Sequence, residues 1–232
     1  TGYGMPSFTE VLEAIADAWT NRRQELIDGG QRLVEAMERQ SVVAAAGAVL
    51  ERSTLDAARL NLRQRFDAKY GGWEGAPKFP QPMTLEFLLR QHLRNPDSDA
   101  LAMAEKTLEE MAHGGMYDQV GGGFARYSTD GRWLVPHFEK MLYDNALLAR
   151  LYLHAYQLTG NPIYRRIVEE TLDYVIREMT HPKGGFYSTQ DADSEGEEGK
   201  LFLWTPEEVK AVLHQAPGGP AEGADAGADG GR

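Results

Sequence analysis

One segment of the sequence holds three side chains whose types suit proton transfer: His137, Lys140 and Asp144. Successive helical residues are turned by about 100°, so Lys140 lies about 300° and Asp144 about 700° from His137, which places all three on one face. Glu139, at about 200°, would point nearly the opposite way. A histidine at a helix start with a carboxylate two turns along suits acid–base catalysis. The alternative is that His137 caps the helix and the other two form a solvated stripe.

A second segment, residues 190–198, is rich in carboxylates that could act as acid and base or grip sugar hydroxyls. Read as an EF-hand, it lacks the bidentate glutamate at position twelve, where Phe202 stands. We therefore expect no EF-hand and no resident metal, with a looser cation site as the remaining metal alternative. The alternative to a functional site is that the segment is a solvated acidic loop. Its residues at EF-hand positions one, three, five and six would be Asp191, Asp193, Glu195 and Gly196.

Other catalytic and cofactor motifs fail. His137 and Glu139 have the spacing of a zinc deaminase motif, but the chain has no cysteine to complete it. The three glycines at 121–123 open no helix and precede no lysine, so they do not predict a phosphate-binding loop. We expect no cofactor.

These segments need helices to position them, and helical periodicity dominates the sequence. Ser7 with Glu10 predicts a capping box, and Gly29-Gly30 predicts a bend or break in the helical run that follows. Asn161-Pro162 predicts a further helix start, as does Thr205-Pro206. Short aromatic stretches near 124–127, 186–187 and 201–204 are candidates for small hairpins. The intervening helices are expected over residues 53–69, 84–93, 98–112 and 136–158.

A glycine pair followed by an aromatic residue recurs between the helices, at Gly72-Trp73, Gly123-Phe124 and Gly185-Phe186. The recurrence, at a distance of about one helical hairpin, predicts stacked helix pairs in a solenoid or a closed α/α toroid. The alternative is that these glycines are ordinary helix C-caps.

Composition excludes several classes of protein. The chain of 232 residues has 24 Lys plus Arg and 35 Asp plus Glu, a net charge of −11, which argues against nucleic-acid binding. No apolar run is long enough to cross a bilayer, so we expect no membrane partner and a cytoplasmic location. Residues 216–232 are mostly Gly and Ala with some Pro, Asp and Glu and no aromatic residue, which predicts a disordered tail.

Three long motifs carry a resemblance to a known family: YGGWEGAPKFP, GGMYDQVGGGFARYSTDGRWLVPHFEKMLYDNALLARLY and GGFYSTQDADSEGEEGKLFLWTPEEV. The chain resembles the spermatogenesis-associated protein 20-like family from Gly2 to His214. Members of that family join a thioredoxin-like domain to a six-hairpin, glycosidase-like α/α toroid.

The resemblance implies a mainly α fold and three regions. Residues 1–50 would be the end of the thioredoxin-like domain and its exit helix, with the redox motif upstream. Residues 51–215 would form about three of the six hairpins of the toroid, and residues 216–232 would be the tail. The chain would thus be an internal fragment. Its oligomeric state stays open.

By similarity to N-acylglucosamine 2-epimerase-like enzymes and glycoside hydrolases, the toroid implies that a sugar or glycan is bound or modified at its mouth. His137 would be the acid/base and Asp144 its orienter. The alternatives are a thioredoxin-linked redox or folding factor, in which the toroid only recognises clients, and a structural interaction module. The other expected site residues are Asp191 and Asp193 as carboxylate partners, Trp73, Tyr127 and Trp133 as stacking platforms, and Lys78, Lys140 and Glu195 as substrate contacts.

Overall fold

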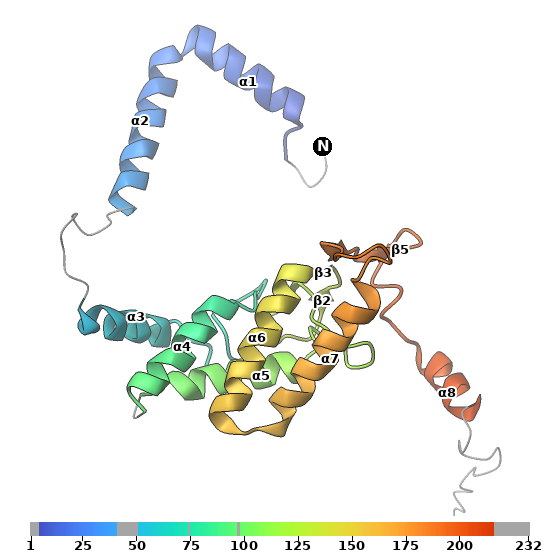
Figure 1. Ribbon diagram of the computed structural model, residues 1–232. Coiled ribbons are helices and arrows are strands. Elements are labelled where there is room, and N and C mark those ends of the chain that lie inside the picture. Colours follow the sequence, from blue (N-terminus) through green and yellow to red (C-terminus); the bar gives the residue numbers. More distant parts are fainter. Residues whose placement is uncertain (1–4, 41–50, 74, 97, 216–232) are drawn as a thin grey trace, which may run out of the picture. The chain divides into compact units, whose positions relative to one another are not determined.

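The computed structural model describes residues 5–40, 51–73, 75–96 and 98–215 of the chain (Figure 1). The chain divides into two units, Thr1–Glu51 and Arg52–Arg232. The expected tail at 216–232 lies outside the described residues. The assignment of residues 1–50 to a thioredoxin-like domain stays a prediction.

The first unit is a pair of helices, α1 (Phe8–Asn21) and α2 (Arg23–Gln40). The predicted capping box is present: the Ser7 hydroxyl accepts from the Glu10 amide, and the Glu10 carboxylate accepts from the Ser7 amide at 2.7 Å. Of the bend or break predicted at Gly29-Gly30, the break is wrong. Helix α2 continues through both glycines, and the chain leaves helical geometry at Arg22 instead, where φ is −139°.

The second unit is built from helical hairpins. Helices α4 and α5 pack on each other, as do α6 and α7, and α4 also packs against α6 (Figure 1). Their contact faces form one core of aliphatic and aromatic side chains, including Leu88, Met111, Phe124 and Tyr152. The helices are α3 (Arg52–Gln64), α4 (Pro82–Arg94), α5 (Ala100–His113), α6 (Leu142–Thr159), α7 (Pro162–Glu178) and α8 (Pro206–Gln215). None of the described helices is both long and apolar enough to cross a membrane.

Short connections join α4 to α5 and α6 to α7, whereas long loops follow α3, α5 and α7. The long loops contact one another in series: the Lys78 amide donates to the Ser128 carbonyl at 2.8 Å, and the Leu142 amide donates to the Ser188 carbonyl at 3.0 Å. These loops hold three two-stranded antiparallel pairs. The pairs are β1 (Tyr127–Ser128) with β2 (Pro136–His137), β3 (Lys140–Met141) with β4 (Thr189–Gln190), and β5 (Asp193–Ser194) with β6 (Glu197–Glu198).

The recurring glycine pairs make one turn three times. Each pair lies at positive φ, between 68° and 93°, and is followed by the aromatic residue that closes an antiparallel bridge. Because glycine alone adopts such backbone angles without strain, the turn requires the pair. The glycines are therefore loop turns and not helix C-caps. The bridges are Phe66 with Trp73, Tyr117 with Phe124, and Thr180 with Phe186.

Two helix boundaries differ from those predicted. Helix α3 ends at Gln64 and not near residue 69, because the chain turns there to form the first bridge. Residues 136–141 are not helical: β2 pairs with β1, β3 pairs with β4, and α6 begins only at Leu142. Residues 201–204, a predicted hairpin candidate, form turn and irregular structure.

Candidate functional site

His137 lies at the centre of the strongest candidate site. Strand β2 pairs it with Tyr127 of β1, and the two rings stack with centroids 5.1 Å apart at 26°. Phe79, from the loop before α4, packs on the Tyr127 ring, with the two ring centroids 4.8 Å apart. The His137 Nδ1 atom lies 2.6 Å from Oε1 of Glu198, on strand β6. Three long loops therefore hold this imidazole in one orientation.

Glu139 lies on the same side of the chain as His137, contrary to the helical prediction. In extended backbone, residues i and i+2 share a face, whereas a helix would separate them. Oε2 of Glu139 is 3.9 Å from Nε2 of His137, and it accepts a hydrogen bond from Nη1 of Arg126 at 2.9 Å. The site thus combines an imidazole, two carboxylates and a guanidinium, and only His137 among them was predicted.

Asp144 adds a buried carboxyl group from the first turn of α6. Its exposed fraction is 7%, and its Oδ2 atom has no hydrogen-bond partner among the described residues. Burial raises the pKa of Asp144 to about 6; the Arg126 charge opposes this shift and the Glu139 charge adds to it. In the described structure the carboxylate that contacts His137 Nδ1 belongs to Glu198 and not to Asp144, so the predicted orienting role of Asp144 is wrong.

The acidic segment reaches the site through a residue that the sequence analysis missed. Asp191 and Asp193 are exposed and hydrogen bond to each other, with the Asp193 amide donating to Asp191 Oδ1 at 3.1 Å. Glu195 forms an ion pair with Lys200 at 2.7 Å. Glu195 and Gly196, both at positive φ, form the two-residue turn that brings Glu198 to His137.

The sequence does contain a signal for this hairpin, namely the Glu195-Gly196 pair, which also fits positions five and six of an EF-hand. A short turn that contains glycine between polar residues is typical of a two-residue hairpin. That hairpin pairs Asp193 with Glu198 and so carries Glu198 back along the loop.

Three of the predicted substrate-binding residues lie inside the protein. Trp73 is 3% exposed and donates from Nε1 to the Leu62 carbonyl at 2.9 Å, and Trp133 is fully buried. Lys78 is also fully buried, with Nζ 2.6 Å from Asp67 Oδ2. These side chains have no surface to offer a ligand, so the predictions that they stack on or contact substrate are wrong. They complete the loop core instead.

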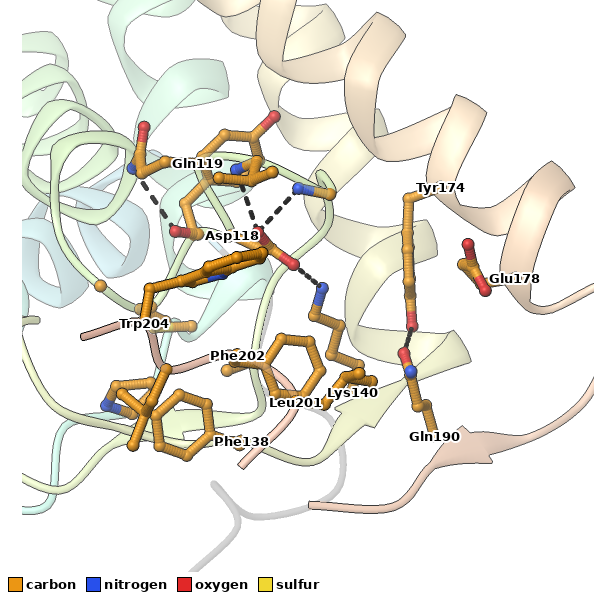
Figure 2. A pocket seen from close by; sticks show the side chains of 18 of the residues that line it. Asp118, Gln119, Phe138, Lys140, Tyr174, Glu178, Gln190, Leu201, Phe202 and Trp204 are labelled. Atoms are coloured by element: carbon orange, nitrogen blue, oxygen red, sulfur yellow. Dashed lines mark hydrogen bonds and ion pairs between the residues drawn. The ribbon is translucent and has the colours of Figure 1, made fainter. Parts of the chain in front are cut away.

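Lys140 lines a cavity whose lining residues do not include His137, and its side chain points toward Asp118 (Figure 2). It is 3% exposed, and Nζ donates to Asp118 Oδ2 at 2.8 Å and to the Gly122 carbonyl at 2.9 Å. Desolvation lowers the pKa of Lys140, and the Asp118 hydrogen bond opposes that shift. Successive side chains of this extended segment point to opposite sides, so Lys140 lies on the side opposite to His137 and Glu139. The predicted shared face of His137, Lys140 and Asp144 therefore does not form.

Within the described ranges, no three His, Asp or Glu side chains converge in a way that could hold a metal ion. The His137 site brings together a held imidazole, a carboxyl group with a raised pKa and a partly exposed guanidinium. The stack of His137, Tyr127 and Phe79 ends in the exposed Phe79 ring, which supplies an apolar face beside them.

Comparison with solved structures identifies the helical architecture. A sugar epimerase from a ruminal bacterium matches with a TM-score of 0.51 and 14% identity, over 62% of this chain and 44% of that one. Cellobiose 2-epimerase from Bacillus thermoamylovorans B4167 matches with a TM-score of 0.50 and 13% identity, over 71% and 49%. The likeness shows the fold: the chain is mainly α and forms part of an α/α toroid.

Comparison of sequences gives a closer relationship. No family model matches the chain. Spermatogenesis-associated protein 20 of Rattus norvegicus and that of Homo sapiens are each 41% identical to it over 231 residues, which cover 93% of the chain. The chain spans 29% of the length of each relative. The expected resemblance is confirmed: along most of its length, the chain is a homologue of one segment of spermatogenesis-associated protein 20.

Proposed function

We propose that this part of the toroid supplies a sugar-binding site in which His137 exchanges a proton with the sugar. The observation that carries the proposal is the 2.6 Å contact between His137 Nδ1 and the Glu198 carboxylate. A carboxylate at Nδ1 favours the tautomer that carries its proton there, which leaves the Nε2 lone pair free to act as a base. The protonated ring then returns the proton as an acid.

The surrounding groups suit a sugar as the ligand. The Phe79 ring, which packs on Tyr127 and is 42% exposed, offers an apolar face of the kind on which a sugar ring stacks, and Arg126 offers donors to ring or exocyclic oxygens. Asp144 has an unpartnered carboxyl oxygen beside them. A hydroxyl group of the ligand would satisfy that oxygen, and satisfying a buried polar atom favours binding.

The likeness of the fold to a sugar epimerase and a cellobiose 2-epimerase supports this proposal, at the level of architecture only. Two reactions use such a site. An epimerase would remove a proton from a carbon next to a carbonyl group, with His137 as the base. A proton would then be delivered to the opposite face of the planar intermediate, by the Asp144 carboxyl group or by His137 after that intermediate has turned over. A hydrolase would protonate the leaving oxygen, a task for which the raised pKa of Asp144 is suited.

The test is thermal unfolding of the chain with and without glucose, mannose, N-acetylglucosamine and cellobiose. A sugar that binds only the folded state stabilises it by about 2.7 kcal/mol at a hundredfold excess over its Kd. We expect at least one sugar to raise the melting temperature, and His137→Gln to abolish that rise.

The matched control is His113→Gln, because His113 is exposed at the end of α5 and hydrogen bonds only to the Glu109 carbonyl in the described structure. It should leave the response to sugar unchanged. No response to any sugar, or an equal response in His137→Gln, would overturn the proposal. That result would favour a toroid that recognises clients without turnover.

A further inference from the structure

The loops contain two buried lysines in equivalent settings, and the second of them, Lys140, borders a cavity. Lys78 pairs with Asp67 and Lys140 pairs with Asp118, each aspartate lying just before a glycine-pair turn. At the first site the Trp133 ring fills the space beside Lys78, with Nζ 5.5 Å from the ring centroid. At the second site a cavity of about 530 Å³ remains.

The walls of this cavity are mainly apolar and aromatic (Figure 2). Phe138 and Phe202 stack on each other at 5.6 Å, and Lys140 Nζ lies 4.3 Å from the centroid of the Tyr174 ring. Trp204 borders the cavity yet is 56% exposed, so much of its surface is available to a ligand. The volume is in the range of small-molecule sites.

Most of the polar side chains that line the cavity have partners within the protein. Lys140 uses two of its donors on Asp118 and Gly122, and the Tyr174 hydroxyl donates to Gln190 Oε1 at 2.7 Å. A sugar brings several hydroxyl groups that each need a partner on burial, and this lining has few to give. The side-chain amide of Gln119 is likewise committed to the Ala112 and Gly114 carbonyls.

The charges of the lining are also balanced. Lys140 faces Asp118, and Arg177 Nε lies 2.7 Å from Glu178 Oε1. An ionic ligand would find no unpaired opposite charge among these residues and would lose hydration on entry. The cavity therefore favours uncharged ligands over ions.

We infer that this cavity binds an uncharged aromatic ring compound, packed against Trp204, Phe202 and Phe138. The inference does not rest on the proposed sugar site, because Phe138 and Lys140 face this cavity whereas His137 and Glu139 lie on the opposite side of the same extended segment. Aromatic stacking and burial of apolar surface supply the affinity, and no covalent step is involved.

The test is saturation-transfer NMR of the 232-residue chain with 2-naphthol, an uncharged ring compound, and with 2-naphthoate, the same ring system carrying a charge. We expect 2-naphthol to bind with a Kd of about 1 mM or below. 2-Naphthoate should bind about tenfold more weakly or not at all. A tenfold excess of cellobiose should not displace 2-naphthol.

Trp204→Ala removes an exposed wall and should weaken 2-naphthol binding about tenfold. The matched control is Trp19→Ala, since Trp19 is 48% exposed and lies in the other unit of the chain. If Trp204→Ala misfolds, Leu203→Gln changes another exposed lining residue and should also weaken binding. Undetectable binding of 2-naphthol, equal binding of 2-naphthoate, or equal binding by the Trp204 variant would overturn the inference.

His137→Gln separates this inference from the proposed function. It should leave 2-naphthol binding unchanged, whatever it does to the response to sugars. Loss of 2-naphthol binding in that variant would show that the ring compound occupies the His137 site, and would overturn the assignment to this cavity.

Discussion

Lys140 has the same role after the second glycine-pair turn that Lys78 has after the first. Each ammonium group is buried, donates to an aspartate and to a glycine carbonyl, and lies over an aromatic ring. Asp67 and Asp118 each also accept two backbone amides of their own turn. One ion pair thus ties each turn to the segment that leads into the next helix.

Asp118→Asn should destabilise the protein, because it removes the charge that compensates Lys140 while keeping an oxygen for the turn amides. Uncompensated buried charges are costly, and since the Asp118 side chain is 20% exposed we expect a loss of about 2 kcal/mol. Urea denaturation at pH 7 measures it. The control is Glu195→Gln, which breaks an exposed pair with Lys200 and should cost less than about 0.5 kcal/mol. Equal losses in the two variants would contradict a structural role for the buried pair.

Gly72→Ala should destabilise the first turn for two separate reasons. Its φ of 72° is unfavourable for alanine, and an added Cβ would lie 2.7 Å from Cζ2 of Trp133. Together these predict a loss of about 2–3 kcal/mol in urea denaturation. Gly75→Ala is the matched control, because its Cβ would meet no heavy atom within 4 Å. A Gly72 variant as stable as the Gly75 variant would be inconsistent with this turn geometry.

The features that sequence predicted well depend on neighbouring residues. The capping box at Ser7 forms, as do the helix starts at Asn161 and Thr205. Each joins a cap residue to amides two or three positions along, so its pattern is visible within one short window. The repeated turns were visible for the same reason, since Gly71-Gly72 and the aromatic residue after them are adjacent in sequence.

The features that sequence missed depend on distant partners. Residues 136–141 have helical spacing, but pairing with β1 of the same loop and with β4 of the loop after α7 keeps them extended, which reverses the faces expected for Glu139 and Lys140. Glu198 contacts His137, although the two are 61 positions apart in the sequence. The buried Lys140 pairs with Asp118, which lies 22 positions before it. No local window contains these partners, so tertiary packing overrides the helical period.

Glu198→Ala should change the tautomer of His137. The Glu198 carboxylate lies 2.6 Å from Nδ1 and stabilises a proton there, so its removal lowers the share of neutral rings that carry the proton on Nδ1. Long-range ¹⁵N NMR of the imidazole measures the two tautomers. Glu197→Ala is the control, because it changes the neighbouring strand residue without contacting His137 in the described structure. An unchanged tautomer ratio in Glu198→Ala would remove the basis for Nε2 as the proposed base.

Asp144 should make folding stability fall as the pH rises. Burial raises the pKa of Asp144 in the folded protein to about 6, from an ordinary value of 3.8, so the folded state binds the proton more tightly than the unfolded state. The stabilisation by that proton is complete below about pH 4 and is lost as the pH rises through 6. The shift of about 2 pKa units corresponds to about 3 kcal/mol at most.

Urea denaturation of wild type and Asp144→Asn between pH 4 and 7.5 isolates this contribution, because every other titrating group is common to both proteins. The stability of wild type relative to the variant should decrease by up to about 3 kcal/mol across that range, since the asparagine never ionises. Glu207→Gln, in the first turn of α8 and exposed, is the control and should show no such divergence. A difference between wild type and Asp144→Asn that stays constant with pH would mean that the pKa of Asp144 is the same in the folded and unfolded states. Asp144 would then be ionised near neutral pH and could not serve as an acid there.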